Sequence, residues 1–120
     1  MAKILVIDHI EIIVEIQRAL KDLEHEVIAC PMGEGALEIY EKSKPDLVII
    51  EPLVSDSDGW QLLEQIVGLS DIPVIVATSL SEVDDIDRAL DLGADEYIKK
   101  PYGSKELAMR IESCLVTRND

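Results

Sequence analysis

The sequence predicts an α/β fold: a doubly wound, five-stranded parallel sheet in the order 2-1-3-4-5, covered by five helices. Short apolar runs alternate strictly with amphipathic stretches along the 120 residues, as in repeated strand–helix units. The third and fourth apolar runs have no polar face, which predicts strands buried between two helical layers. We expect the first and fifth helices on one face of the sheet, and the second, third and fourth on the other.

Each predicted strand is a short run of mostly apolar residues that stops at a polar residue or a turn. Lys44-Pro45 marks the turn before the third strand, and Lys99-Lys100-Pro101 ends the fifth. The predicted strands are residues 4–7, 27–29, 46–50, 73–77 and 97–98.

Each predicted helix carries apolar residues at three- and four-residue spacing, with charged residues between them. We interpret Trp60, after Asp58-Gly59, as a packing anchor at the start of the third helix, with a role in partner contact as the alternative. Ser81 is expected to cap the fourth helix, with Gly93 behind it, and the acidic residues from Glu82 to Asp87 are interpreted as a solvated face. The predicted helices are residues 10–24, 35–42, 60–69, 82–92 and 104–116.

The composition indicates a single domain, residues 1–120, and excludes several classes of function. The 25 acidic residues outnumber the 11 basic ones, so the net charge is −14 and we expect binding neither to nucleic acid nor to membranes. No stretch is long enough to span a bilayer, and the first residues lead into a strand without a signal peptide. These observations predict a cytoplasmic protein, in which we expect Cys30 and Cys114 to be reduced and buried.

Polar residues follow the predicted strands at the points where they end. The carboxyl ends of parallel strands meet along one rim of the sheet, where open α/β sheets build their sites. The residues expected to converge there are Asp8, His9, Glu51, Thr78, Ser79 and Lys100.

Four segments, KILVID (3–8), PDLVII (45–50), PVIVATS (73–79) and GADEYIKKP (93–101), closely resemble the response-regulator receiver domains of two-component signalling. The resemblance covers essentially the whole chain and implies their flavodoxin-like fold. In that family two acidic residues after the first strand hold Mg²⁺, and an Asp after the third strand accepts a phosphoryl group. A Thr or Ser after the fourth strand and a Lys after the fifth contact the phosphoryl oxygens.

Residue by residue, the resemblance assigns Asp8 to the first acidic position, Thr78 to the hydroxyl and Lys100 to the lysine. Tyr97 matches the aromatic residue whose rotamer follows that hydroxyl. Pro101 matches a proline whose peptide bond is usually cis, which would aim the lysine into the site.

The two departures from the family fall on the acceptor and on a metal ligand, since Glu51 replaces the acceptor Asp and His9 replaces the second acid. Glu is one methylene longer and moves the carboxylate off the in-line geometry of phosphoryl transfer. Imidazole is a poor ligand for Mg²⁺. We therefore expect a pseudo-receiver, that is, a receiver domain that has lost ordinary phosphorylation and uses no cofactor. Mg²⁺ binding should be weak or absent, with Asp8 and Glu51 as the only, weak, candidate ligands. We also expect Lys100 to contact Glu51.

Several alternatives stay open for these side chains. Glu51 either imitates a phosphorylated acceptor, reaching Lys100 or Thr78, or belongs to a decayed site. His9 either places an imidazolium between Asp8 and Glu51, forms a soft-metal site with Asp8, or is exposed and silent. Thr78 and Tyr97 either form a switch or are an ordinary strand-end hydroxyl and a half-buried aromatic.

The leading hypothesis is a signalling module that is not an enzyme and acts through protein–protein interaction, independently of phosphorylation. Its partner would be a histidine kinase, an output domain, another signalling protein or a second copy. The alternative is an active receiver phosphorylated with Mg²⁺ at Glu51 or a nearby carboxylate such as Asp56. A flavodoxin-like cofactor binder is disfavoured, because no Gly/Ser/Thr-rich phosphate loop follows the first strand. Whether the domain stands alone or belongs to a larger regulator stays open.

Four charged residues resemble positions through which winged-helix DNA-binding regulators pair their receivers. Ile86 and Ser113 depart from that pattern, so an ordinary salt-bridged surface is the alternative. The four residues of the possible dimer face are Glu96, Lys105, Glu106 and Arg110.

Overall fold

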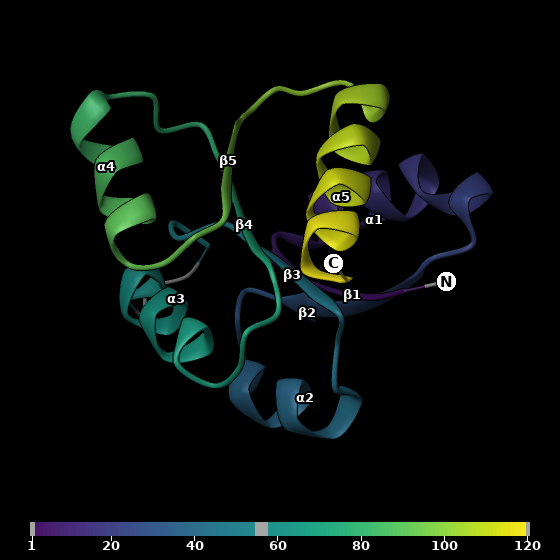
Figure 1. The fold of residues 1–120 in the computed structure, drawn as a ribbon, viewed down its shortest axis with the longest axis horizontal. Coiled ribbons are helices and arrows are strands. Elements are labelled where there is room, and N and C mark those ends of the chain that lie inside the picture. The colour runs from purple at the N-terminus through teal and green to yellow at the C-terminus, as the bar shows by residue number, and fades with distance from the viewer. Residues whose placement is uncertain (1, 55–57, 120) are drawn as a thin grey trace.

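The computed structural model describes residues 2–54 and 58–119, and for residues 117–119 it describes the backbone only. The candidate acceptor Asp56 therefore lies outside the described residues. A five-stranded parallel sheet in the order β2-β1-β3-β4-β5 forms the centre of the molecule (Figure 1), which confirms the predicted fold class. The strands are β1 (Lys3–Asp8), β2 (Glu26–Pro31), β3 (Leu47–Ile50), β4 (Val74–Thr78) and β5 (Glu96–Lys99).

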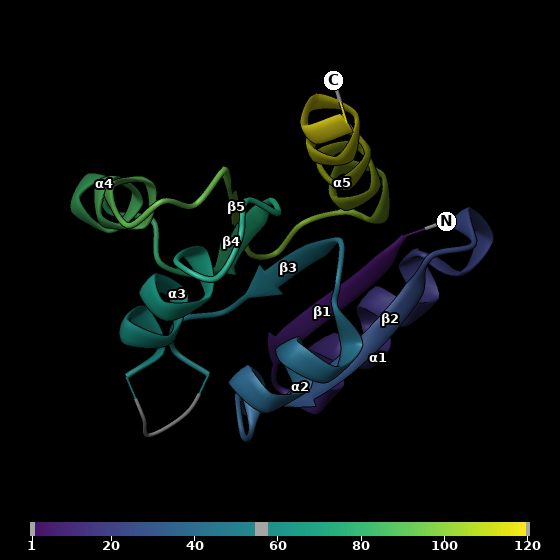
Figure 2. The same cartoon turned by 60° about the horizontal axis from the view of Figure 1, so that its bottom comes forward.

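The helices cover both faces of the sheet. Side chains of α1 and α5 pack on one face, and those of α2, α3 and α4 on the other, as predicted. Figure 1 shows α1 and α5 side by side, and Figure 2 shows α3 and α4 at the opposite end of the molecule from the N-terminus. The helices are α1 (Ile10–Ala19), the 3₁₀ turn η1 (Lys21–Leu23), α2 (Ala36–Ser43), α3 (Gly59–Val67), α4 (Val83–Asp91) and α5 (Ser104–Asn119).

The two helical layers explain why the central strands are apolar at every position. In β3, Leu47 and Ile49 enter the core under α1 and α5, whereas Val48 and Ile50 enter the core under α2, α3 and α4. Side chains alternate between the faces of a strand, so a strand covered on both sides must be apolar throughout. This burial fixes the strand ends, and with them the polar residues that follow.

Two local predictions were wrong. The helix expected to reach residue 24 ends at Ala19, because η1 and a left-handed turn at Glu24 (φ 61°) redirect the chain into β2. Glu82, not Ser81, is the N-cap residue of α4, and no side chain caps that end. Gly93 does follow the helix, with a φ of 109° that favours glycine. Within the described ranges, no helix combines the length and the apolar character needed to cross a membrane.

Candidate functional site

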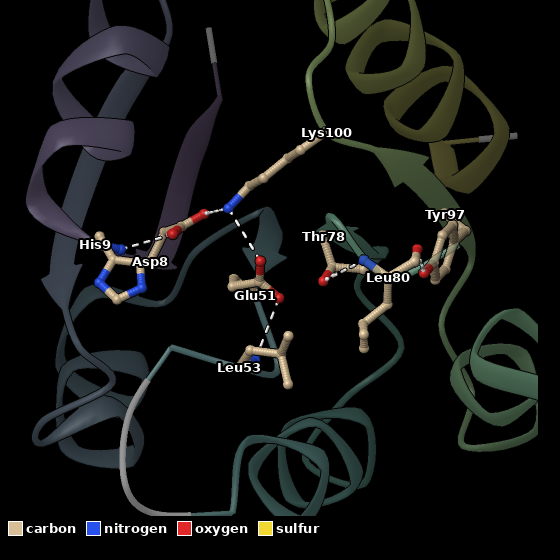
Figure 3. A network of polar contacts seen from close by, with 8 residues as sticks. All are labelled: Asp8, His9, Glu51, Leu53, Thr78, Leu80, Tyr97 and Lys100. Carbon is tan, nitrogen blue, oxygen red and sulfur yellow. Dashed lines mark hydrogen bonds and ion pairs between the residues drawn. The ribbon is translucent and has the colours of Figure 1, made fainter. Parts of the chain in front are cut away.

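Four strand ends bring Asp8, Glu51, Thr78 and Lys100 to one rim of the sheet (Figure 3). Asp8 ends β1, Glu51 directly follows β3, Thr78 ends β4, and Lys100 directly follows β5. Asp8 and Thr78 are fully buried, and Glu51 is 4% exposed. Four of the six residues predicted to converge therefore do so, two buried carboxyl groups among them, whereas the side chain of Ser79 is exposed.

The Lys100 ammonium group lies between the two carboxylates. Its Nζ is 2.8 Å from Asp8 Oδ2 and 3.1 Å from Glu51 Oε1. The Lys100 backbone N–H donates to the Thr78 carbonyl at 2.8 Å, which fixes the start of the side chain, and the Lys100-Pro101 bond is cis as predicted. The contact with Glu51 was expected from the sequence, whereas the shorter one with Asp8 was not.

Backbone N–H groups bind the remaining carboxylate oxygens. Asp8 Oδ1 accepts from the His9 N–H at 2.6 Å, and Glu51 Oε2 accepts from the Leu53 N–H at 3.2 Å. Burial raises the pKa of Asp8, while the hydrogen bonds from Lys100 and His9 lower it and the negative charge of Glu51 raises it further. Burial is the largest of these effects, so the pKa of Asp8 stays above its ordinary value.

His9 contributes its backbone and not its ring. It is the N-cap residue of α1 in an extended conformation (φ −69°, ψ 150°), its side chain is exposed, and Figure 3 shows the ring on the far side of Asp8 from Glu51. The hypothesis of an imidazolium between the two acids was therefore wrong, and with it the placement of this side chain in the acidic pocket. Lys100 occupies that position instead, and His9 matches the alternative of an exposed residue.

Thr78 and Tyr97 meet at the peptide groups of Leu80, which sequence reasoning missed. Thr78 Oγ1 accepts from the Leu80 N–H at 3.3 Å, and the Tyr97 hydroxyl donates to the Leu80 carbonyl oxygen (Figure 3). Burial raises the pKa of Tyr97, with further contributions from Asp85 and Glu51, so the hydroxyl keeps the proton that it donates. Leu80 acts through backbone atoms, which every residue has, so its identity gave no signal.

The ligand set at this rim does not fit Mg²⁺. The ion prefers six oxygen ligands in octahedral geometry, and the pocket offers the carboxylates of Asp8 and Glu51. Their oxygens already accept hydrogen bonds, and the Lys100 ammonium stands between them, where it would repel a divalent cation. In the part of the chain that the structure describes, no three His, Cys, Asp or Glu side chains are grouped as metal ligands.

The four residues of the possible dimer face lie close together, and three of them pair within one chain. Arg110 Nη1 is 2.6 Å from Glu96 Oε1, and Arg110 Nη2 is 4.0 Å from Glu106 Oε2, while Lys105 is exposed. These pairs correspond to the alternative of an ordinary salt-bridged surface, and a dimer through this face stays a prediction.

Trp60 is the packing anchor that the sequence predicts. It is buried in the core under α2, α3 and α4, and the Arg88 guanidinium of α4 lies 4.4 Å from the centre of its ring. Asp58 caps α3 through its side chain, which accepts from the N–H groups of Trp60 at 3.0 Å and Gln61 at 3.2 Å.

Comparisons with known proteins agree with this geometry. A family model described as the response regulator receiver domain matches residues 4–112. The chain is 40% identical over 114 residues to a probable transcriptional regulator, ycf27, of Porphyridium aerugineum, covering 94% of this chain and 48% of that protein. It is 39% identical over 85 residues to the heme response regulator HssR of Staphylococcus aureus, covering 71% of this chain and 38% of that protein.

Solved structures give the same fold. A two-component response regulator from Clostridium difficile superimposes with a TM-score of 0.93 at 27% identity, over 100% of both chains. The BeF3-activated N-terminal receiver domain of Klebsiella pneumoniae RstA gives 0.88 at 28% identity, over 94% of this chain and 97% of that one. The chain spans about half the length of the ycf27 relatives that it matches.

Proposed function

Since the chain belongs to the response regulator receiver domain family, we propose that it is a receiver that signals through protein–protein interaction without being phosphorylated at its acidic pocket. The observation that carries this proposal is the Lys100 ammonium between Asp8 and Glu51. Under this proposal the chain is not an enzyme and uses no cofactor. Its partner is a histidine kinase, an output domain, another signalling protein or a second copy.

The acceptor position is poorly suited to attack a phosphoryl donor. Both Glu51 oxygens are hydrogen-bonded, one to Lys100 and one to the Leu53 N–H, and the side chain is nearly fully buried. A nucleophile has to approach the transferred group in line, and these contacts aim the carboxylate into the protein. With both oxygens held by Lys100 and the Leu53 N–H, the Glu51 carboxylate would have to give up a hydrogen bond before it could attack a donor.

Weak Mg²⁺ binding would remove the second requirement of the reaction. Phosphoryl transfer depends on cations that offset charge on the transferring group. At this rim the Lys100 ammonium already pairs with two carboxylates. His9, at the second acidic position, donates a backbone hydrogen bond to Asp8 but contributes no side-chain ligand. Two carboxylates share the single positive charge of Lys100, so among the described residues at this rim the lysine has no unpaired charge to offer a donor.

The same contacts support a limited imitation of an activated receiver. Glu51 reaches Lys100, as a phosphoryl oxygen would, but the hydrogen bonds of the described residues do not join it to Thr78. Thr78 and Tyr97 instead hold the Leu80 peptide groups in place. The β4–α4 loop is thus fixed without a bound group, which favours one standing conformation available to a partner.

The test is intact-mass measurement after incubation with acetyl phosphate and MgCl₂. We expect no mass gain for the wild-type chain, and a gain of one phosphoryl group for Glu51→Asp combined with His9→Asp, because Thr78 and Lys100 still match the family. Glu51→Asp alone should react less, since a metal ligand is still missing. A phosphoryl adduct on the wild-type chain would refute the proposal and support the alternative of an active receiver.

A further inference from the structure

His25 joins three segments of the chain at the amino ends of the strands, on the opposite edge of the sheet from the acidic pocket. It directly precedes β2, and its ring contacts Ala2, which directly precedes β1, and Glu112 of α5. The His25 side chain is 7% exposed and Ala2 is 8% exposed, whereas the Glu112 side chain is 51% exposed. We call these three residues the His25 clasp.

Both ring nitrogen atoms of His25 have a partner. Nδ1 lies 3.0 Å from the backbone nitrogen of Ala2, and Nε2 lies 2.6 Å from Oε1 of Glu112. A backbone N–H can only donate, so Nδ1 must be the unprotonated nitrogen that accepts from Ala2. Nε2 then carries the ring hydrogen and donates it to the Glu112 carboxylate. The geometry therefore requires one particular neutral tautomer of His25.

A proton added to His25 is incompatible with one of these two contacts and favours the other. In the imidazolium form both nitrogen atoms carry a hydrogen, so Nδ1 can no longer accept from the Ala2 N–H. Turning the ring over does not restore the bond, because Nε2 also carries a hydrogen. The contact with Glu112, by contrast, becomes a charge-assisted hydrogen bond. Proton uptake from solvent therefore breaks the bond to Ala2 and keeps the bond to Glu112.

The carboxylate that pairs with the ring is that of Glu112. The Lys3 side chain, on β1, is directed to another segment, where its Nζ donates to the Ser43 carbonyl oxygen at 3.4 Å. The other charged residues of the segments that meet near the ring are exposed, so solvent screens their effect on it. These residues are Lys21, Asp22, Glu24, Glu26 and Asp46.

We propose that the His25 clasp is released by a proton. With His25 neutral, the clasp ties the start of β1 to α5, and with His25 protonated, Ala2 is freed while the ring stays with Glu112. Histidine changes its charge between about pH 5 and pH 8, so the release falls in the physiological range. The Ala2 carbonyl oxygen still accepts from the Glu26 N–H at 2.9 Å, which keeps β1 beside β2. The attachment of α5 to the sheet thus depends on pH, and because the clasp contains no residue of the acidic pocket, its release is independent of phosphorylation.

NMR spectroscopy of the full chain tests this proposal. At about pH 8 a long-range ¹H–¹⁵N spectrum should show His25 as the Nε2–H tautomer. The protection of the Ala2 N–H against hydrogen exchange, measured relative to an unstructured peptide with the same first residues, should fall at least about threefold between about pH 8 and about pH 5. An Nδ1–H tautomer, a ring that stays neutral at about pH 5, or a ring that titrates without any change at Ala2 would overturn the proposal.

Variants of the two histidines separate the clasp from the other titrating groups. His25→Gln supplies an amide that can accept from Ala2 or donate to Glu112 but takes up no proton, so the protection of Ala2 should change by less than about twofold over the same pH range. His9→Gln is the matched control, because it removes the exposed histidine at the other edge of the sheet and should show the wild-type loss of protection. A loss that persists in His25→Gln, or that disappears in His9→Gln, would contradict the clasp. The tautomer of the wild-type chain needs no variant, so the proposal stays falsifiable even if His25→Gln does not fold.

Discussion

Lys100→Met should destabilise the protein more than any other replacement of a single lysine among the described residues. Methionine keeps most of the side-chain volume but removes the ammonium that lies between two buried carboxylates. The Lys100 side chain is only 16% exposed, so solvent screens these ion pairs weakly. Breaking a buried pair by removing one partner costs about 3–5 kcal/mol. For a chain of this length that corresponds to a fall in melting temperature of roughly 12–20 °C.

The loss of unfolding free energy caused by Lys100→Met should increase as pH rises. Burial already raises the pKa of Asp8 above 3.8 in the folded protein, so the folded state binds this proton more tightly than the unfolded chain does. The unfolding free energy therefore falls as pH rises from 3.8 through the folded pKa, and the full penalty is present above it. Lys100→Met removes an influence that lowers this pKa, so the window extends to higher pH. The deficit relative to wild type should be larger at about pH 8 than at about pH 5.

Urea unfolding of wild type and variant at both pH values measures these differences. Lys42→Met is the matched control, because Lys42 pairs with Glu38 at 2.9 Å on the exposed surface and should lose at most about 1 kcal/mol. Adding Glu51→Gln to Lys100→Met removes one of the unpaired charges and should recover part of the loss. A deficit for Lys100→Met below about 1 kcal/mol, or one that is the same at both pH values, would refute the buried charge arrangement.

The combination of Glu51→Asp and His9→Asp should melt below wild type without Mg²⁺ and regain stability as MgCl₂ is added, because it adds a carboxylate next to Asp8 in the sequence. A melting temperature insensitive to MgCl₂ would contradict this. Burial and the nearby acids raise the pKa of Tyr102 to about 12. The difference in absorbance between wild type and Tyr102→Phe should therefore show a tyrosine that ionises well above the usual pKa of 10.0. The unfolding free energy should fall as pH rises from 10.0 to about 12, because the folded state binds this proton more tightly. Gly59→Ala should lose about 1–3 kcal/mol of unfolding free energy, because its Cβ would lie 1.8 Å from the Pro52 carbonyl oxygen. A wild-type midpoint in urea unfolding would rule that contact out.

The sequence was sufficient to predict the sheet, its layers and the convergence of Asp8, Glu51, Thr78 and Lys100. Those predictions depend on burial and on the handedness of strand crossovers, which are properties of whole segments. Local errors do not disturb them, so the carboxyl ends of the strands were predicted to within two residues. The first helix was nevertheless predicted too long, and Ser81 was assigned a cap that it does not form.

The side-chain contacts within the site were predicted less well. His9 lies one residue beyond β1, where the extended N-cap conformation of α1 turns its ring outward, and no periodicity reports that dihedral angle. Lys100 was expected at Glu51, but its shorter contact with Asp8 depends on the reach of a flexible side chain. In the contacts of Thr78 and Tyr97 with Leu80, the Leu80 partners are backbone atoms, which the sequence does not distinguish.

The ammonium that closes the acidic pocket is part of the chain itself. Each newly folded molecule therefore carries this ammonium in place. The fraction of molecules in which the ammonium fills the pocket cannot change with the supply of a phosphoryl donor. Under the proposed function, a cell could change the output of this receiver through the numbers of receiver and partner molecules it makes and degrades, but not through a phosphoryl donor. Its response would then follow synthesis and proteolysis, over times far longer than the turnover of an acyl phosphate.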